Sequence, residues 1–149
     1  MLFRSKIYEQ EPTDVVAVAG LSLDIERGDF VAMAGPSGSG KTTVLNLLGG
    51  LTQASRGRIW IGNEELSALD GKQLARLRLE QIGFVFQAYN LLPVLSALEN
   101  AEFTLLLRGV PAEERHARGM ALFDEIGLGE LADRRPGKLS GGQQQRVAV

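Results

Sequence analysis

The sequence of 149 residues predicts an α/β fold in which a strand-rich first half precedes a helical second half. Residues 30–34 form a continuous apolar run, Phe-Val-Ala-Met-Ala, which is typical of a strand buried on both faces. A glycine-rich loop and a helix-forming segment, residues 41–48, follow this run directly. Beyond residue 96, the start and stop signals are those of helices. A strand–loop–helix unit with helices attached to it is therefore expected.

The strands are expected where β-branched and apolar residues alternate with polar ones or form short uninterrupted runs. Residues 26–29, Glu-Arg-Gly-Asp, predict a turn immediately before the buried strand. The segments expected to be strands are 3–8, 15–18, 21–25, 30–34, 58–61 and 82–86.

The helices are expected where a capping residue or a proline opens an amphipathic segment. Asp70, Ser96 and Ser140 are the predicted caps, Pro111 lies in a first turn, and Gly127 is a stop signal. The segments expected to be helices are 41–48, about 70–81, about 96–108, about 111–126 and the chain from Gly141 onward.

The composition excludes several classes of protein. The 16 Lys and Arg residues against 18 Asp and Glu residues give a net charge of −2, so no nucleic-acid partner is expected. The sequence holds no cysteine, which excludes disulfides, cysteine-ligated zinc, iron–sulfur clusters and thiol catalysis. No apolar run reaches about 18 residues, and the first residues are not expected to be a signal peptide, so a cytoplasmic location is expected.

The glycine-rich loop, Gly-Pro-Ser-Gly-Ser-Gly-Lys-Thr, matches the pattern G-x-x-x-x-G-K-[ST] over residues 35–42. Glycines let backbone N–H groups curl around phosphate oxygens, Lys41 brings a positive charge to the β- and γ-phosphates, and the Thr42 hydroxyl is a ligand for Mg²⁺. A purely structural loop is the alternative, and the strand before it and the helix after it disfavour that reading. The predicted binding residues are Gly35, Pro36, Ser37, Gly38, Ser39, Gly40, Lys41, Thr42 and Thr43.

A second glycine motif, Leu-Ser-Gly-Gly-Gln, occupies residues 139–143. Ser140 caps the helix that follows, and the two glycines leave the backbone N–H groups of the helix start accessible to an anion. Taken alone, the motif fits a plain helix start as well as a ligand site.

Together with the residues that follow it, Gln-Gln-Arg-Val-Ala, this motif resembles the signature motif of ATP-binding-cassette (ABC) ATPases. Val-Phe-Gln at 85–87, before Asn-Leu-Leu-Pro at 90–93, resembles their Q-loop. The resemblance covers the whole chain. Residues 53–59 and 84–100 are most similar to the bacterial subgroup that serves lipoprotein-releasing and macrolide-exporter-type permeases.

The resemblance implies a P-loop NTPase core of the ABC ATPase type, with an N-terminal antiparallel β subdomain and a helical subdomain. The chain is then a single, partial nucleotide-binding domain, with the β subdomain and phosphate-loop core over about 1–87 and the helical subdomain over about 88–149. ATP and Mg²⁺ are the implied cofactors.

The resemblance also implies roles for individual residues. Gln87 is identified with the glutamine that joins Mg²⁺ and the attacking water to the transporter contact, so it is both a catalytic and a metal-binding candidate. Tyr8 matches an aromatic residue that stacks on adenine, although an edge-strand aromatic is the alternative. The signature residues, which close over the γ-phosphate of a nucleotide held by the partner subunit, are Ser140, Gly141, Gly142 and Gln143.

The sequence ends at Val149, before the points where the family has its Walker B aspartate, the glutamate after it, the D-loop and the switch histidine. His116 and the carboxylate pairs Glu64–Glu65 and Glu113–Glu114 do not replace these groups, because they are expected to be exposed surface charge. We therefore expect a fragment of a longer protein, with an incomplete parallel sheet and no ATP hydrolysis of its own.

The function expected from the resemblance is that of the ATP-binding subunit of an ABC transporter. Two such subunits, paired head to tail around two ATP molecules, would drive a membrane permease from the inner face of the membrane. The apolar residues 91–95 are expected either to contact the permease or to pack within the helical subdomain. A non-transport ABC ATPase acting as a mechanochemical clamp is the alternative. A third possibility is a different P-loop protein, such as a small-molecule kinase. That hypothesis explains the glycine-rich loop but assigns no function to Gln87 and residues 139–143.

Overall fold

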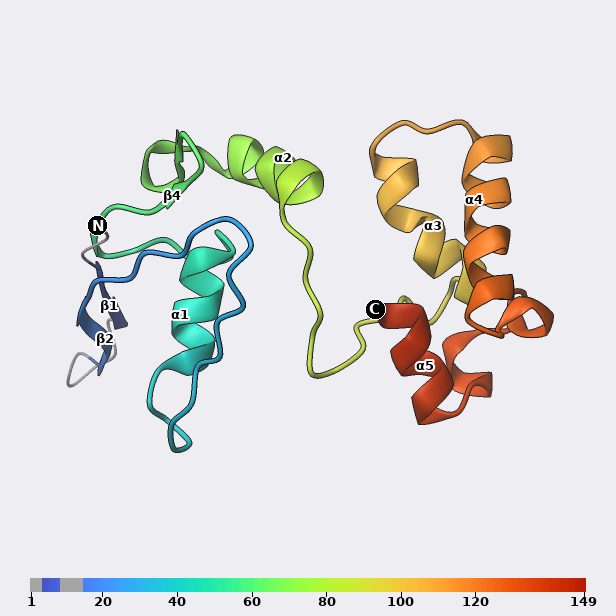
Figure 1. The fold of residues 1–149 in the computed structure, drawn as a ribbon, viewed down its shortest axis with the longest axis horizontal. Coiled ribbons are helices and arrows are strands. Elements are labelled where there is room, and N and C mark those ends of the chain that lie inside the picture. The colour runs from blue at the N-terminus through green and yellow to red at the C-terminus, as the bar shows by residue number, and fades with distance from the viewer. Residues whose placement is uncertain (1–3, 9–14) are drawn as a thin grey trace. The chain divides into compact units, whose positions relative to one another are not determined.

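A computed structural model describes residues 4–8 and 15–149 of the protein (Figure 1). The chain divides into two compact units, Met1–Arg78 and Leu79–Val149, and each has its own elements. The expected subdomain boundary near residue 87 stays a prediction.

The strands of the first unit form two small antiparallel sheets. In the larger sheet, β1 (Arg4–Tyr8) lies between β2 (Val15–Leu21) and β3 (Arg56–Gly57), and both pairings are antiparallel. In the smaller sheet, β4 (Trp60–Ile61) pairs with β5 (Glu64–Glu65) across a tight turn. The N-terminal antiparallel sheet is therefore present, and every pairing between described strands is antiparallel.

Two helices and a 3₁₀ turn complete the first unit. Helix α1 (Lys41–Leu48) begins directly after the glycine-rich loop and buries one side of its surface through Val44 and Leu47. Helix α2 (Gly71–Gln81), whose last residues belong to the second unit, follows the 3₁₀ turn η1 (Leu66–Ala68). The end of α1 is tied to α2, because the Arg78 guanidinium donates a hydrogen bond of 2.8 Å to the Gly50 carbonyl.

The second unit is helical. Helix α3 (Ala97–Leu107) packs side by side with α4 (Ala112–Glu125), and the last helix, α5 (Gly141–Ala148), also contacts α3 (Figure 1). The 3₁₀ turns η2 (Gly129–Leu131) and η3 (Pro136–Lys138) connect α4 to α5. The core of this unit, which fixes the place of α5, consists of Ala97, Leu98, Phe123, Leu128, Ala132, Leu139 and Val147.

The expected helices are confirmed, with ends within about two residues of the predicted ones. Ser96 and Ser140 each form a capping box with the residue three positions on, Glu99 and Gln143. Asp70 does the same with Gln73 through reciprocal bonds of 2.8 and 2.9 Å. These caps are local interactions, which is why the sequence predicts them well.

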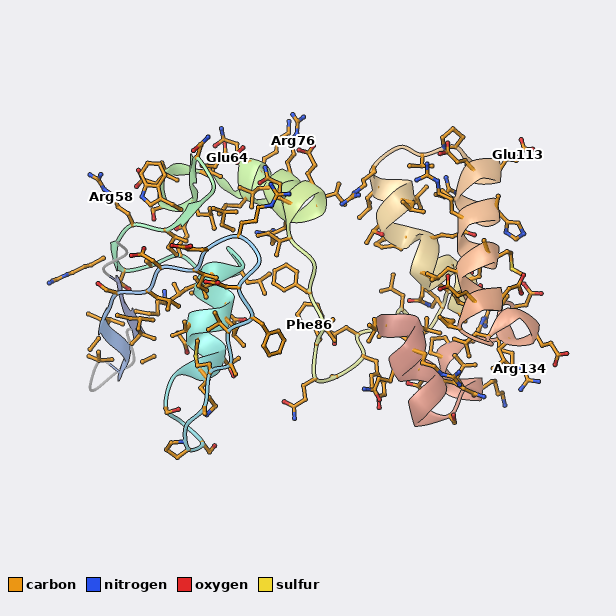
Figure 2. The ribbon with its side chains drawn as sticks, viewed as in Figure 1. Arg58, Glu64, Arg76, Phe86, Glu113 and Arg134 are labelled. Carbon is orange, nitrogen blue, oxygen red and sulfur yellow. The ribbon has the colours of Figure 1, made fainter. Side chains whose placement is uncertain are left out.

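Several of the expected strands are wrong. Residues 30–34 and 82–86 are extended without being strands, because no segment in the described part of the chain supplies a ladder of hydrogen bonds to them. Apolar side chains of these segments are therefore exposed to solvent: Phe30 is 97% exposed and Val85 is 69% exposed. Figure 2 shows Phe86 on the extended segment after α2, where its ring stacks on that of Phe84 with centroids 5.5 Å apart.

The predicted strands 21–25 and 58–61 are also corrected. Only Leu21 of the first belongs to a strand, as the last residue of β2. The second is split, because the Ile59 N–H donates to the Ser67 hydroxyl (2.8 Å) and its carbonyl accepts from the Leu66 N–H (2.7 Å). These two bonds tie Ile59 to η1 and leave only Trp60 and Ile61 for pairing with β5.

Candidate nucleotide-binding site

The glycine-rich loop, residues 35–40, joins the extended segment 30–34 to α1. Gly38 and Gly40 have φ angles of 78° and 85°, a left-handed conformation that favours glycine. A Cβ atom on Gly40 would lie 2.5 Å from the Ala17 carbonyl oxygen, so the loop packs directly against the backbone of β2. The loop therefore has its shape because glycines stand at these two positions.

The Lys41 ammonium is folded back into the curve of this loop. Its Nζ donates hydrogen bonds to the carbonyl oxygens of Gly35 and Pro36, both at 2.7 Å, and to Ser39 Oγ at 3.2 Å. The positive charge is thus held at the loop itself, beside the first turn of α1.

The N-terminus of α1 is open to an anion. Its N-cap is Gly40, and no side chain in the described part of the chain caps the helix start. Its first turn, Lys-Thr-Thr, also has no acidic residue. The first N–H groups of a helix and the positive end of its dipole attract negative charge. Loop, ammonium and helix start therefore fit a phosphate group.

Thr42 and Thr43 are the second and third residues of α1. The Thr42 residue is exposed and Thr43 is partly buried. A threonine hydroxyl is one of the hard oxygen ligands that Mg²⁺ accepts beside water and phosphate oxygens. Among residues 4–8 and 15–149, no group of three or more His, Cys, Asp or Glu side chains could hold a metal ion. The binding of Mg²⁺ by Thr42 stays a prediction.

Tyr8 is the last residue of β1, where its backbone lies opposite Val15 of β2. The placement of its side chain lies outside what the structure describes, so its stacking on adenine stays a prediction.

The signature residues lie at the start of α5. Ser140 Oγ accepts a hydrogen bond from the Gln143 N–H at 3.3 Å, and Gln143 Oε1 accepts one from the Ser140 N–H at 2.8 Å. Ser140, Gly141 and Gly142 are exposed, so this helix start is accessible from outside the unit. The Ser140 and Gln143 side chains, which could both contact a ligand, therefore hold each other in fixed positions.

Gln87 is exposed and lies in the loop between α2 and α3. It belongs to the same unit as the signature residues, whereas the phosphate loop belongs to the other unit. The structure brings the predicted residues together as two groups, residues 35–43 and residues 140–143. The joint action of Gln87 and the phosphate loop stays a prediction.

The charged residues that are not expected to be functional are exposed or lie close to a residue of opposite charge. Glu64 and Glu113 are exposed (Figure 2). Glu65 lies 3.7 Å from the Arg58 guanidinium, and Glu114 pairs with Arg118 one turn further along α4. His116 is exposed and its Nδ1 lies 3.5 Å from Glu102.

Two features of the second unit were not expected from the sequence. Glu102 of α3 and Arg115 of α4 form an ion pair of 3.8 Å between side chains that are only 13% and 17% exposed. The Tyr89 hydroxyl lies near the first residue of α5, at 3.6 Å from where a Cβ atom on Gly141 would be. Both features join distant parts of the sequence, and no spacing in the sequence indicates them.

Comparison with known proteins decides the family. The model of the family described as ABC transporter matches residues 18–149. The chain belongs to this family. Members that it resembles include an uncharacterized ABC transporter ATP-binding protein of Thermotoga maritima, at 48% identity over 97% of this chain and 62% of that protein.

Other relatives belong to the subgroup expected from the sequence. The lipoprotein-releasing system ATP-binding protein LolD of Pseudomonas fluorescens is 47% identical over 97% of this chain and 63% of its own length. The macrolide export ATP-binding/permease protein MacB of Marinobacter nauticus is 50% identical over 91% of this chain and 21% of its own length. The chain thus spans less than two thirds of the length of each of these three relatives.

A solved structure confirms the expected fold class. The ATP-binding cassette MJ0796, in a dimeric post-hydrolysis state bound to ADP and Pi, superposes with a TM-score of 0.90 at 40% identity. The superposition covers 99% of this chain and 66% of that cassette. Within the described residues, no helix of this chain is both long enough and apolar enough to cross a membrane.

Proposed function

We propose that this chain is the nucleotide-binding part of an ABC transporter subunit, which uses the binding and hydrolysis of ATP to drive a membrane permease. The observation that carries the proposal is the Lys41 ammonium, held inside the glycine loop beside the uncapped N-terminus of α1. A positive charge and free N–H groups at one place are the requirements for binding a polyphosphate.

Each residue of the loop has a separate task in this proposal. Lys41 Nζ exchanges its bonds to the carbonyl oxygens of Gly35 and Pro36 for bonds to the β- and γ-phosphates. The N–H groups at the start of α1 hold the phosphate oxygens, and the Thr42 hydroxyl binds Mg²⁺. The bound Mg²⁺ supplies positive charge that offsets the charge of the phosphates during transfer. Tyr8 stacks on the adenine.

The signature residues act on a nucleotide held by a second copy of the subunit. Ser140, Gly141 and Gly142 are exposed at the positive end of α5, where they can donate hydrogen bonds to the γ-phosphate across an interface. Gln87 orients the attacking water and joins the metal to the permease contact. The dimeric state of MJ0796 and the names of LolD and MacB support this arrangement. The subunit would be cytoplasmic and held at the inner face of the membrane by its permease.

We propose hydrolysis for the full natural protein that contains this chain. Residues 1–149 alone are expected to be inactive, because their carboxylate pairs face solvent or pair with arginines and do not lie in the phosphate loop. Hydrolysis requires a group that accepts a proton from water or positions that water.

The test compares two lysine variants of the full natural protein in a direct ATP-binding titration. Lys41→Ala removes the ammonium from the loop and is expected to weaken ATP binding by at least about tenfold, the usual cost of losing a charge-assisted contact. Lys72→Ala removes an equal charge from the exposed surface of α2 and is expected to bind ATP as the wild type does. Equal affinities of the wild type and the Lys41→Ala variant would contradict the proposal.

A further inference from the structure

The Ser55 hydroxyl forms hydrogen bonds with both backbone groups of one residue in β1. Its Oγ accepts a bond of 3.1 Å from the Ile7 N–H, and the same hydroxyl donates a bond of 3.2 Å to the Ile7 carbonyl oxygen. The two residues are 48 positions apart in the sequence. Ser55 immediately precedes β3, so this contact ties the start of β3 to the last residues of β1.

These bonds continue the pairing of β1 with β3 beyond the residues whose backbones pair. In that pairing, Ser5 lies opposite Arg56, the first residue of β3. A backbone partner in an antiparallel ladder supplies one donor and one acceptor to the residue opposite. A serine hydroxyl can supply both from one side chain. Ser55 therefore takes the place of a strand partner for Ile7.

The Ile7 carbonyl belongs to the peptide group that also includes the nitrogen and Cα atoms of Tyr8. Because a peptide group is planar, a hydrogen bond at its oxygen restricts where the Cα atom of Tyr8 lies. On the opposite edge of β1, Tyr8 pairs with Val15 of β2. The Tyr8 backbone is therefore held from both edges of β1, by β2 and by Ser55.

The earlier part of β1 constrains this end of the strand less than an unbroken ladder would. Its pairing with β2 shifts register between Arg4 and Lys6, and again between Lys6 and Ile7. Such irregularities bend a strand and interrupt its ladder. The position of Tyr8 thus depends on contacts that follow the irregularities, and the contact of Ser55 with Ile7 is one of these.

Both bonds of Ser55 are exposed, so water can replace the hydroxyl at either backbone group at a small cost in stability. A water molecule does not belong to the chain, so it would not connect the residue before β3 to Ile7. Loss of the hydroxyl is therefore expected to change the position of the β1 end more than the stability of the protein.

We propose that Ser55 is a positioning residue, whose hydroxyl fixes the backbone at Tyr8 and thereby the ring that stacks on the adenine of ATP. This proposal rests on the proposed function, because it assigns Ser55 a part in adenine recognition at the same nucleotide site. Stacking contributes to the affinity for a base only while the ring and the base overlap. Ser55 acts through Tyr8 and requires no contact with the nucleotide.

The test compares the binding of ATP and of inorganic tripolyphosphate, which has the phosphate chain without the base, to the full natural protein. Ser55→Ala is expected to weaken the binding of ATP by about fivefold, a part of what stacking contributes to affinity. The affinity for tripolyphosphate is expected to change by less than about twofold, because the phosphate loop is unaltered. Ser55→Thr keeps a hydroxyl on a residue suited to strands and is expected to bind ATP as the wild type does.

A double variant shows whether Ser55 acts through Tyr8. Tyr8→Ala is expected to weaken the binding of ATP at least as much as Ser55→Ala does. Adding Ser55→Ala to Tyr8→Ala is expected to weaken it no further, because the ring that Ser55 positions is already absent. Losses of affinity that multiply in the double variant would overturn the proposal.

Ser67→Ala is the matched control. The Ser67 hydroxyl also bonds to the backbone of the first unit, since it accepts a hydrogen bond of 2.8 Å from the Ile59 N–H, and Ser67 is exposed as Ser55 is. Its removal is expected to lower the melting temperature at least as much as Ser55→Ala does and to leave both affinities unchanged. The proposal is overturned if Ser55→Ala binds ATP as the wild type does, if it weakens the binding of both ligands equally, or if Ser67→Ala has the same effects.

The proposed function has a separate readout in the same experiment. A wild-type protein that does not bind ATP would contradict the proposed function, whatever the variants do. Amide exchange at Ile7 in the nucleotide-free protein is expected to be faster in Ser55→Ala than in the wild type and in Ser67→Ala. This measurement tests the contact of Ser55 with β1 without any nucleotide, and equal exchange rates would overturn the proposal about Ser55.

Discussion

Gly40 is the residue at which the phosphate loop has the least room. Its φ of 85° is unfavourable for other residues, and an added Cβ would meet the Ala17 carbonyl oxygen at 2.5 Å. Gly40→Ala is therefore expected to destabilise the protein by more than about 1 kcal/mol, since backbone strain and a steric clash add together. Thermal unfolding of the full natural protein measures this loss.

Gly62→Ala is the control for the clash. Gly62 also has a positive φ, 55°, but no described atom lies within 4 Å of its Cβ position. Its replacement tests strain alone and is expected to lower the melting temperature less than Gly40→Ala does. A larger decrease for Gly62→Ala would contradict the close packing of the loop against β2.

Single residues differ in how well the sequence predicts their roles. The shape of the phosphate loop and the helix after it follow from one contiguous motif, residues 35–42, and the binding of a nucleotide by these residues stays a prediction. The nearness of Tyr89 to Gly141 and the ion pair of Glu102 with Arg115 are not predicted. These depend on how α3, α4 and α5 pack, and packing is decided by the whole unit.

Among the elements, α3 and α5 have the same cap and different predicted roles. Ser96 and Ser140 both form a capping box, with hydrogen-bond distances of 3.1 and 3.3 Å from the backbone N–H to the serine hydroxyl. Ser96→Ala and Ser140→Ala are each expected to cost about 1 kcal/mol of stability. Only Ser140→Ala is expected to lower ATP hydrolysis as well, because only the start of α5 faces a nucleotide in the proposed dimer.

Chemical denaturation and ATPase assays on the two serine variants measure these effects separately. An equal decrease of hydrolysis in both variants would mean that the effect of Ser140 is one of stability. That result would contradict a direct role of the α5 start.

Helices and strands differ in what their sequences specify. The helices are predicted because their hydrogen bonds and caps lie within a few residues, as at Ser96 and Ser140. The apolar runs 30–34 and 82–86 match the pattern of buried strands and yet form none. A strand requires a second segment for its hydrogen bonds, and no described segment of this chain pairs with them. An apolar run therefore indicates that a segment suits a buried strand, but it does not indicate which segment would pair with it.

At the scale of the whole molecule, the two groups of site residues belong to different units. The phosphate loop is in Met1–Arg78, and Gln87 and the signature are in Leu79–Val149. In the proposed arrangement, each complete site combines the phosphate loop of one copy with the signature of a second copy. Two copies then form two such sites, and the loss of either motif removes both sites from a pair of identical subunits.

Complementation between two inactive variants of the full natural protein tests this central claim most directly. Lys41→Ala removes the ammonium from the glycine-rich loop, and Gly141→Asp places a carboxylate at the exposed start of α5. Each variant alone is expected to hydrolyse little ATP. In an equal mixture, half of the pairs would contain one intact site, so hydrolysis is expected to recover to about a quarter of the wild-type rate. A mixture no more active than either variant alone would contradict the shared site.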